Sequence, residues 1–242
     1  MVNRYRIADK VVEICSIYEK VHNYCSDYLT DEPADYTVTT TQADIDFERE
    51  KNAKSAILEG RQPYNSSDSY LEELAIYRKI AEQMINYDTI LFHGSCIAVD
   101  GVGYLFTAKS GTGKSTHTRL WREYLGDKAV MVNDDKPLLH ITDSGVIAYG
   151  TPYNGKHRLG TNTSVPLKAI CILTRAAENY IDPISFEQAY TMLLQQVYRP
   201  ADSILMMKTL TMIDRLPDTV KLYRLGCNRD ILAAKVAYEG MR

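Results

Sequence analysis

The sequence predicts an α/β fold with a small α+β lobe at its amino end. Strand-like apolar runs alternate with amphipathic helical patterns along most of the 242 residues, which is typical of an α/β domain. A polar stretch at residues 61–69 (RQPYNSSDS) separates a first segment, with strands and helices of its own, from the remainder. We therefore expect a small α+β lobe over residues 1–65 and a larger domain over residues 66–242.

Each element of the first lobe is predicted from a local pattern. Alternating apolar residues predict a strand at 5–14, and apolar residues at helical spacing behind a Ser16 and Glu19 capping box predict a helix at 17–28. The β-branched run DYTVTT predicts a short strand at 35–40. The charge-rich stretch that follows predicts a solvated helix at 42–56.

The larger domain begins with a helix at 69–85, which a second capping box (Ser69 with Glu72) and one apolar face predict. A strand at 91–99, a tight Asp100-Gly101 turn and a strand at 103–107 then form a predicted hairpin. Further strands are expected at 129–132, 145–149 and 167–173, and further helices at 116–124, 185–198, 201–215 and 228–241.

Composition excludes several classes of protein. The chain is 45% hydrophobic, and its 28 basic against 31 acidic residues give a net charge of −3, which excludes a uniformly basic nucleic-acid-binding surface. No apolar run approaches the roughly 20 residues of a membrane-spanning helix, and the amino end lacks a secretory pattern. The five cysteines form no CxxC pair, which indicates reduced thiols. We expect a cytoplasmic protein that binds neither nucleic acid nor membrane.

The strongest motif is AKSGTGKST at residues 108–116, between the predicted hairpin strand and a helix. The order of strand, glycine loop and helix predicts a P-loop, whose backbone amides and helix N-terminus bind phosphate, and a coincidental glycine loop is the alternative. Ala108 stands where the strict pattern has glycine. Lys114 would reach the β and γ phosphates, and Ser115 would place its hydroxyl on a magnesium ion. The candidate nucleotide-binding residues are Ser110, Gly111, Thr112, Gly113, Lys114, Ser115 and Thr116.

Two carboxylates follow the next predicted strand, in the sequence Asn133-Asp134-Asp135-Lys136. A strand, helix and strand unit makes the two strands parallel, so the carboxyl end of the second lies at the same sheet edge as the P-loop. Adjacent residues point in different directions, so one aspartate can face a magnesium ion and the other an incoming hydroxyl. The alternative is that both merely begin a turn.

The hairpin brings a histidine to the same place. If Asp100 and Gly101 are the central turn residues, Val99 pairs with Val102, and the count along the ladder puts His93 opposite Ala108. A histidine there could polarise a phosphoryl oxygen or hydrogen-bond an aspartate. A packing or capping role is the alternative, and a register slip of one residue would turn the side chain away.

Together, the pair His93-Gly94, the hairpin, the P-loop and the sequence at 133–135 resemble the catalytic core of HPr kinase/phosphorylase, within the phosphoenolpyruvate carboxykinase-like P-loop superfamily. Residues 91–156 look like the small bacterial proteins related to it. The resemblance implies a mixed-sheet kinase core that phosphorylates serine with ATP and Mg²⁺. It also implies that Asp134 is the general base, that Asp135 supports the metal or the base, and that homo-oligomers are possible.

The loop at 149–158 (YGTPYNGKHR) departs from that family, because it has no acid where HPr kinases carry a glutamate metal ligand. This departure argues against HPr itself as the substrate. The loop carries Lys156, His157 and Arg158, so it could instead close on the phosphate or bind an acidic group of the acceptor. The candidate substrate residues are Asn154, Lys156 and Arg158. Ordinary solvated charge explains the loop equally well. Weaker candidates are Arg119, Arg175 and Arg199.

The function that these observations favour is phosphoryl transfer from ATP to a hydroxyl, in the serine of a peptide or protein or in a small metabolite. The catalytic residues would then be Asp134, His93 and Lys114, and the metal ligands Ser115 and Asp135. One alternative is a nucleotide-binding regulatory module without activity. Carboxykinase chemistry is the other, and it is less favoured because a second transition-metal ligand set is not apparent in the sequence.

Overall fold

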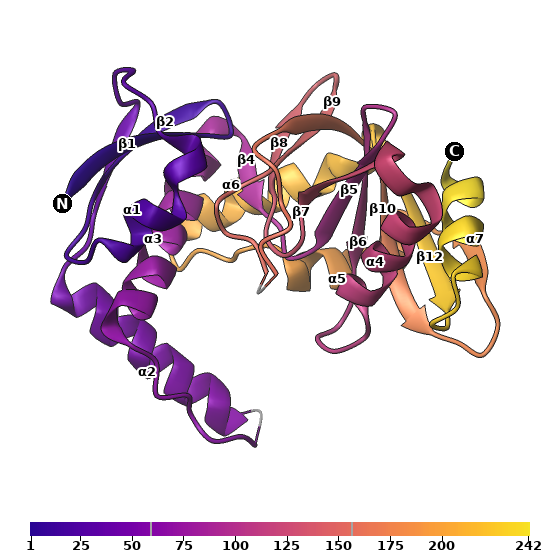
Figure 1. Ribbon diagram of the computed structural model, residues 1–242, viewed down its shortest axis with the longest axis horizontal. Helices are drawn as coiled ribbons and strands as arrows, with labels where there is room; N and C mark the ends of the chain where they lie inside the picture. Colours follow the sequence, from indigo (N-terminus) through magenta and orange to yellow (C-terminus); the bar gives the residue numbers. More distant parts are fainter. Residues whose placement is uncertain (59, 156) are drawn as a thin grey trace. The chain divides into compact units, whose positions relative to one another are not determined.

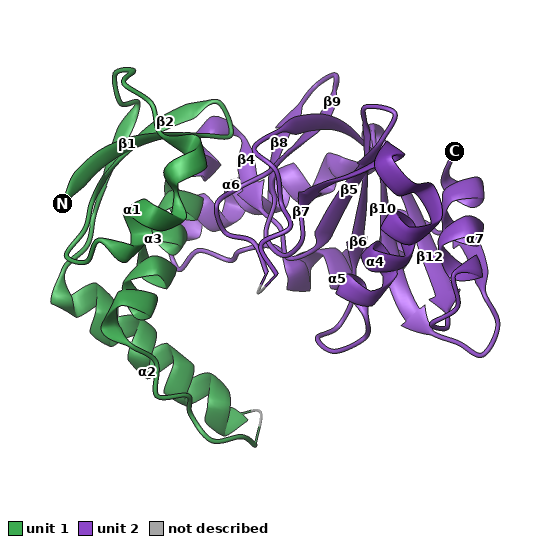
Figure 2. Ribbon diagram, in the orientation of Figure 1, with its two compact units in different colours: residues 1–83 green, residues 84–242 purple. Residues whose placement is uncertain are grey.

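The computed structural model describes residues 1–58, 60–155 and 157–242, and the chain forms two compact units (Figures 1 and 2). Unit 1 comprises Met1–Gln83 and unit 2 comprises Met84–Arg242. Both mix helices with a sheet, as the sequence predicts. Within the described residues, no helix combines the length and the apolar character that crossing a bilayer requires.

Unit 1 is built on a three-stranded sheet in the order β1-β2-β3. The predicted first strand is two strands, β1 (Val2–Ile7) and β2 (Lys10–Cys15), which pair antiparallel. Ala8 and Asp9 between them both have positive φ, at 49° and 59°, and this left-handed pair closes the hairpin. Strand β3 (Tyr36–Thr39) then pairs parallel to β2. The sequence pattern showed the strand character but not the turn, because neither turn residue is glycine.

The helices of unit 1 are α1 (Lys20–Tyr24), α2 (Gln42–Leu58) and α3 (Asp68–Met84). Helix α1 is much shorter than the predicted helix at 17–28, and the predicted capping box is wrong. The helix begins only at Lys20, with Glu19 as its N-cap and no side-chain cap bond, and the Ser16 hydroxyl instead donates to the carbonyl of Tyr18. A single 3₁₀ turn (Ser26–Tyr28) follows.

Helix α3 belongs to unit 1, although the polar loop before it suggested a boundary at residue 65. Its buried Glu72 accepts hydrogen bonds from the backbone amides of Ile17 and Tyr18 and from the Thr40 hydroxyl. Arg78 of the same helix is ion-paired with Glu48 on α2. These contacts tie α3 to the first sheet and to α2, and they explain why the division of the chain comes after Gln83.

Unit 2 contains a curled mixed sheet of nine strands, with the main path β4-β8-β9-β10-β6-β5-β7. Strand β10 also pairs with β12, which in turn pairs with β11. The strands are β4 (Thr89–Leu91), β5 (Ser95–Val99), β6 (Val102–Thr107), β7 (Ala129–Asn133), β8 (Leu138–Thr142), β9 (Gly145–Tyr149), β10 (Ser164–Arg175), β11 (Tyr180–Pro183) and β12 (Lys221–Cys227). The sequence analysis did not predict β8, β11 or β12.

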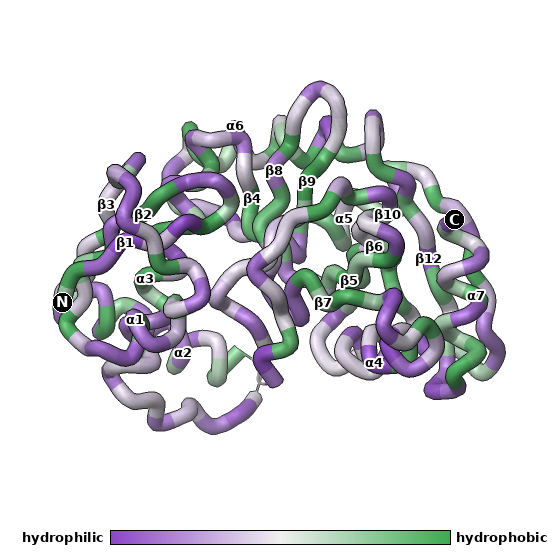
Figure 3. The backbone as a smooth tube through the Cα atoms, turned by 45° about the horizontal axis from the view of Figure 1, so that its top comes forward, coloured by the Kyte–Doolittle hydropathy of each residue, from purple (hydrophilic) through white to green (hydrophobic). Residues whose placement is uncertain are grey.

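Helices cover both faces of this sheet. They are α4 (Lys114–Leu125), α5 (Phe186–Gln196), α6 (Ser203–Asp214) and α7 (Leu232–Met241). Alternate residues of β6 enter different cores: Tyr104 and Phe106 pack with α4 and α7, whereas Leu105 packs with α5 and α6. Figure 3, which is coloured by residue hydropathy, shows hydrophobic residues in green along β5, β6 and β7. The sheet is therefore a buried platform between two helical layers.

The β5–β6 hairpin follows the predicted register. Asp100 and Gly101 have φ of 52° and 76°, as a two-residue turn of this kind requires, and Val99 pairs with Val102. The ladder ends at the pair of Ser95 with Phe106, so the predicted strand at 91–99 is interrupted before β5. The strand is interrupted because the Gly94 amide donates to the Asp135 carbonyl instead of to β6.

Strands β6 and β7 run parallel, as predicted, because each pairs antiparallel to β5 between them. The helix that connects them is α4. Their carboxyl ends therefore lie at the same edge of the sheet, where β6 leads into residues 108–113 and β7 into Asp134 and Asp135. This edge carries the candidate site.

Candidate functional site

The loop between β6 and α4 turns at two glycines directly before the helix begins, as a phosphate-binding loop does. Gly111 and Gly113 have φ of 74° and 126°, in the left-handed region that side chains rarely adopt, and α4 begins at Lys114. The first amides of a helix have no intrahelical acceptor, so those of α4 are available to an anion. Ala108 is fully buried where the strict motif has glycine, and the loop still turns at its two later glycines.

Lys114 lies across this loop. Its Nζ donates to the carbonyl of Ala108 at 3.3 Å, and burial lowers the pKa of its ammonium group while the charge of Asp135 partly opposes that effect. Arg175, at the end of β10, donates to the carbonyls of Gly111 and Thr112 at 2.6 and 3.5 Å. The arginine thus holds the outer part of the loop from a neighbouring strand.

Asn133 organises the two aspartates. Its side chain is fully buried, and its Oδ1 accepts hydrogen bonds from the amides of Asp135 and Lys136 at 2.9 and 2.6 Å. Its Nδ2 donates to the hydroxyl of Thr151 at 3.0 Å. The asparagine thereby folds the chain into a turn directly after β7 and fixes the direction in which each aspartate leaves the sheet.

The neighbouring strand holds the same turn from the other side. The Ser95 hydroxyl donates to the carbonyl of Asp134 at 2.9 Å, and the Gly94 amide donates to the carbonyl of Asp135 at the same distance. A Cβ on Gly94 would lie 3.0 Å from the carbonyl of Phe106, so glycine lets the chain pass close to β6 here. Ser95 and Asn133 are therefore positioning residues for the aspartates.

The two aspartates have different surroundings. Asp134 is 8% exposed, and its Oδ1 accepts a hydrogen bond of 2.6 Å from the Gly155 amide. Asp135 lies 3.4 Å from His93 Nε2. Burial would raise the pKa of Asp135, but the hydrogen bond from His93 and the charges of Lys136, His93 and Lys114 outweigh it and lower the pKa below its ordinary value. Asp135 is therefore held as a carboxylate beside the lysine of the P-loop.

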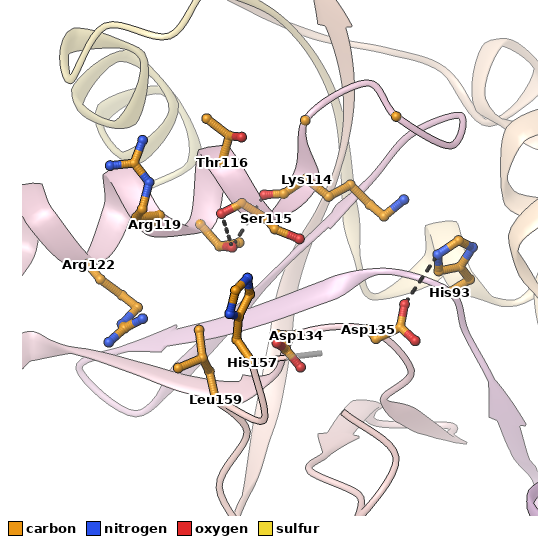
Figure 4. A pocket seen from close by; sticks show the side chains of 13 residues that line it. His93, Lys114, Ser115, Thr116, Arg119, Arg122, Asp134, Asp135, His157 and Leu159 are labelled. Carbon is orange, nitrogen blue, oxygen red and sulfur yellow. Dashed lines mark hydrogen bonds and ion pairs between the residues drawn. The ribbon is translucent and has the colours of Figure 1, made fainter. Parts of the chain in front are cut away.

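These groups open on one cavity of about 770 Å³ (Figure 4). In Figure 4, His93, Lys114 and Asp135 lie toward one end, and His157 and Arg122 toward the other, with Ser115 and Asp134 between them. Its lining residues are His93, Gly111, Gly113, Lys114, Ser115, Thr116, Thr118, Arg119, Arg122, Asp134, Asp135, His157 and Leu159. Within the described residues, no three His, Cys, Asp or Glu side chains are grouped so that they could hold a metal ion.

Most of the candidate residues from the sequence meet in this cavity, and some do not. Ser110 and Thr112 belong to the P-loop but do not line the cavity. Asn154 donates through Nδ2 to the Thr151 carbonyl, and neither it nor Arg158 is a lining residue. Lys156 lies outside the described residues.

Thr118, Arg122 and Leu159 line the cavity, and the sequence analysis did not propose them for the site. The two helical residues had a readable signal, because Thr118 and Arg122 follow Ser115 at spacings of three and seven, which share a helix face. Leu159 had none, because the direction of a loop side chain is set by the fold.

The fold and the site define a mixed α/β protein with a P-loop and an aspartate pair at one sheet edge. The chain belongs to the family described as SynChlorMet cassette protein ScmC, whose model matches residues 65–212. That range includes the P-loop, both aspartates and His93. No curated protein matches the sequence.

Among solved structures, the chain is similar to one titled "Structure of the Hpr(Ser) kinase/phosphatase from Coxiella burnetii". The identity is 11%, the TM-score is 0.36, and the match covers 62% of this chain and 95% of the other. A TM-score of 0.36 is too low for any conclusion to depend on this likeness.

Proposed function

We propose that the protein is an ATP-dependent phosphotransferase that moves the γ-phosphoryl group to a hydroxyl, with serine as the favoured acceptor. The observation that carries the proposal is that the carboxylate of Asp134 opens on the same cavity as the phosphate loop. Phosphoryl transfer depends mainly on positioning and electrostatics, and it needs an anion cradle, a metal and a group that receives the proton of the attacking hydroxyl.

The P-loop end would bind the triphosphate. The amides of residues 111–116 would hold the β and γ phosphates at the N-terminus of α4, and Lys114 would exchange its bond to the Ala108 carbonyl for a phosphate oxygen. Arg175 would keep the loop in shape, because it bonds to two carbonyls on the outer side.

The donor set at this end suits magnesium. Mg²⁺ prefers oxygen ligands and commonly takes one or two from the protein together with phosphate oxygens and water. The hydroxyl of Ser115 and the carboxylate of Asp135 line the cavity beside the cradle, so these two residues would hold the ion. Bound there, magnesium would neutralise charge on the phosphates. His93 would keep Asp135 ionised and oriented.

Asp134 would act on the acceptor. Its carboxylate would accept the proton of the hydroxyl as the oxygen forms its bond to the γ phosphorus and the bond between that phosphorus and the β,γ-bridging oxygen breaks, which leaves ADP. The Gly155 amide occupies Oδ1, so Oδ2 is the oxygen that would receive the proton. The hydrogen bonds from Ser95 and Asn133 to this turn would hold the carboxylate in place.

The test is a transfer assay with γ-labelled ATP and Mg²⁺, with free serine, hydroxyl metabolites and serine peptides as acceptors. Label should move to an acceptor with the native protein and not with Lys114→Ala, which should weaken nucleotide binding at least tenfold without changing the melting temperature. Lys128→Ala, an exposed lysine beyond α4, is the matched control. Bound ATP without transfer to any acceptor would instead favour a regulatory nucleotide-binding module.

A further inference from the structure

The cavity extends beyond the part that a triphosphate needs. The cavity is lined along α4 by Ser115, Thr118 and Arg122, which are three and four residues apart and therefore share one helix face. This face runs from the P-loop to Arg122. With a rise of 1.5 Å per residue, Arg122 lies ~10 Å along the helix axis from Ser115. The far end is thus about two helical turns from the cradle.

The far end is cationic. Arg122 and His157 line it, with Leu159 as the apolar residue beside them, whereas the side chain of Arg119 points away from these two (Figure 4). Arg119 is ion-paired with Glu123 at 2.6 Å on the exposed side of α4. Arg122 differs, because none of the residues in 1–58, 60–155 and 157–242 forms an ion pair with its guanidinium. An arginine without an acidic partner, in a cavity beside a histidine, is suited to bind an anion.

The loop that carries His157 is fixed to the catalytic turn. The Gly155 amide bonds to Asp134 Oδ1, and the Arg158 amide bonds to the Gly155 carbonyl at 2.9 Å, which places His157 in a tight turn directly after the contact with Asp134. A Cβ on Gly155 would lie 3.0 Å from Asp134 Oδ2, so glycine permits this approach. The cationic end therefore has a defined position relative to the carboxylate of Asp134.

We propose that Arg122, with His157, forms a subsite for an acidic side chain of a serine peptide. The proposal rests on the proposed phosphotransferase function and narrows its acceptor. The triphosphate is held at the N-terminus of α4, and the nucleoside attached to it is uncharged, so the nucleotide has no anion left for Arg122. Free serine is too short, because its carboxylate lies only a few bonds from its hydroxyl. An extended peptide covers ~10 Å in about three residues, so the acid should lie about three positions from the serine.

The first experiment measures binding without catalysis. Fluorescent serine peptides, each with one glutamate scanned from five positions before to five after the serine, are titrated onto the protein saturated with Mg²⁺ and a non-hydrolysable ATP analogue. Glutamine peptides are the matched series. We expect the glutamate peptide with a spacing of about three to bind at least tenfold more tightly than its glutamine counterpart. Equal binding of the two series would overturn the subsite.

Variants assign the preference to a residue. Arg122→Gln should remove the preference for glutamate without changing the affinity for the ATP analogue, Arg122→Lys should keep part of it, and Lys128→Gln should change nothing. A loss of affinity for the analogue in Arg122→Gln would place this arginine on the nucleotide and overturn the proposal. A preference that survives in Arg122→Gln would overturn it as well.

The same peptides with γ-labelled ATP separate the two proposals. Transfer to the glutamate and glutamine peptides at equal kcat/KM would retain the phosphotransferase and reject the subsite. Selective binding of the glutamate peptides without any transfer would retain the subsite and reject the phosphotransferase. We expect the glutamate peptide to be labelled with at least tenfold higher kcat/KM, and Arg122→Gln to abolish that difference mainly through KM.

Discussion

Two buried carboxylates, Glu72 in unit 1 and Asp134 in unit 2, have similar burial and very different surroundings. Glu72 is fully buried and accepts three hydrogen bonds, of 2.6, 2.9 and 2.5 Å, which use both of its oxygens. Asp134 accepts one, and among the residues that the structure describes no group donates to its Oδ2. A buried carboxylate normally has its acceptor capacity filled, since an unfilled one costs free energy.

The difference indicates what each group does. All the partners of Glu72 are backbone amides and a hydroxyl from residues distant in sequence, so this carboxylate joins the first sheet to α3. Asp134 opens on a cavity with one oxygen left for a ligand. The same chemical group thus stabilises the fold in one unit, whereas in the other it has an oxygen free for the proton transfer that the proposed function requires.

The largest effect is expected from Asp134→Asn. The amide oxygen can still accept the hydrogen bond from Gly155, so the fold should be preserved, but the proton acceptor is lost. We expect phosphoryl transfer to fall by about 10²- to 10⁴-fold, with the affinity for ATP and the melting temperature near those of the native protein. Asp143→Asn, at an exposed aspartate of the β8–β9 turn, is the control. Transfer above a tenth of the native rate would remove Asp134 from the role of general base.

The converse substitution, Glu72→Gln, should act on stability alone. Glutamine presents an NH₂ group to one side of a site that holds only donors, so at least one backbone amide loses its acceptor. We expect unit 1 to lose about 2–4 kcal/mol of its free energy of unfolding. Urea unfolding followed by circular dichroism measures the change.

Glu50→Gln, at an exposed glutamate on α2, is the matched control and should change the free energy of unfolding by less than about 0.5 kcal/mol. ATP binding should be retained in Glu72→Gln, because the cavity residues all belong to unit 2. An unchanged unfolding transition in Glu72→Gln would contradict the structural role of this carboxylate.

The site around Asp134 could largely be predicted from the sequence, whereas the role predicted for Glu72 was wrong. The P-loop and the aspartate pair are local sequences with strict spacing, and the Asp100-Gly101 turn has so few allowed conformations that the register from Ser95 to Phe106 could be counted. Glu72, by contrast, stands three residues after Ser69 and resembles a capping-box acid. In the structure it binds an amide 54 residues earlier in the chain, which no local pattern records.

The missed elements have the same cause. Strand β12 pairs parallel to β10, and this pairing joins Ala169 to Lys221, so the two strands are brought together by tertiary packing. In the loop after β9, the sequence pointed to His157, which lines the cavity, and also to Asn154 and Arg158, which do not. It gave no signal for Leu159, which lines the cavity as well. Side-chain directions in a loop depend on contacts such as the one between Gly155 and Asp134, and these become visible only in three dimensions.

A smaller effect is expected from Gly155→Ala, which alters the surroundings of Asp134 without removing its carboxylate. The φ of Gly155 is not in the left-handed region, so alanine is compatible with the backbone, but its Cβ would lie 3.0 Å from Asp134 Oδ2. The carboxylate must shift by a few tenths of an ångström, which should lower transfer about tenfold through kcat, since misplacement of catalytic groups is costly.

The affinity for ATP should remain unchanged in Gly155→Ala, because among the described residues the hydrogen bonds of Gly155 are with Asp134 and Arg158 and not with the P-loop. Gly101→Ala is unsuitable as a control because the φ of Gly101 is positive, so Ser144→Ala, in the exposed β8–β9 turn, serves instead. Native transfer in Gly155→Ala would show that Asp134 tolerates the displacement and would weaken the case for a tightly held base.

The smallest effect is expected from a change beside Asp135, the aspartate that His93 and two lysines surround. Its pKa is below the ordinary value of 3.8, although burial opposes this, because of the hydrogen bond from His93 and the charges of Lys136, His93 and Lys114. A carboxyl with a lowered pKa contributes stability above its ordinary pKa and loses it as the pH falls through the pKa of the folded state. His93→Ala removes a cause of the lowering, so the pKa of Asp135 should rise.

The acid limb of Mg²⁺-dependent ATP binding should therefore move to higher pH in His93→Ala, while affinity at neutral pH, where Asp135 stays ionised in both proteins, changes only a few-fold. Titration of ATP binding between pH 3 and pH 7 measures the shift. His140→Ala, which removes a histidine that contacts Thr89 and the Tyr87 carbonyl, is the control and should leave the limb in place. If the acid limb of ATP binding does not move in His93→Ala, the lysines alone keep Asp135 ionised. His93 would then have no part in holding this carboxylate.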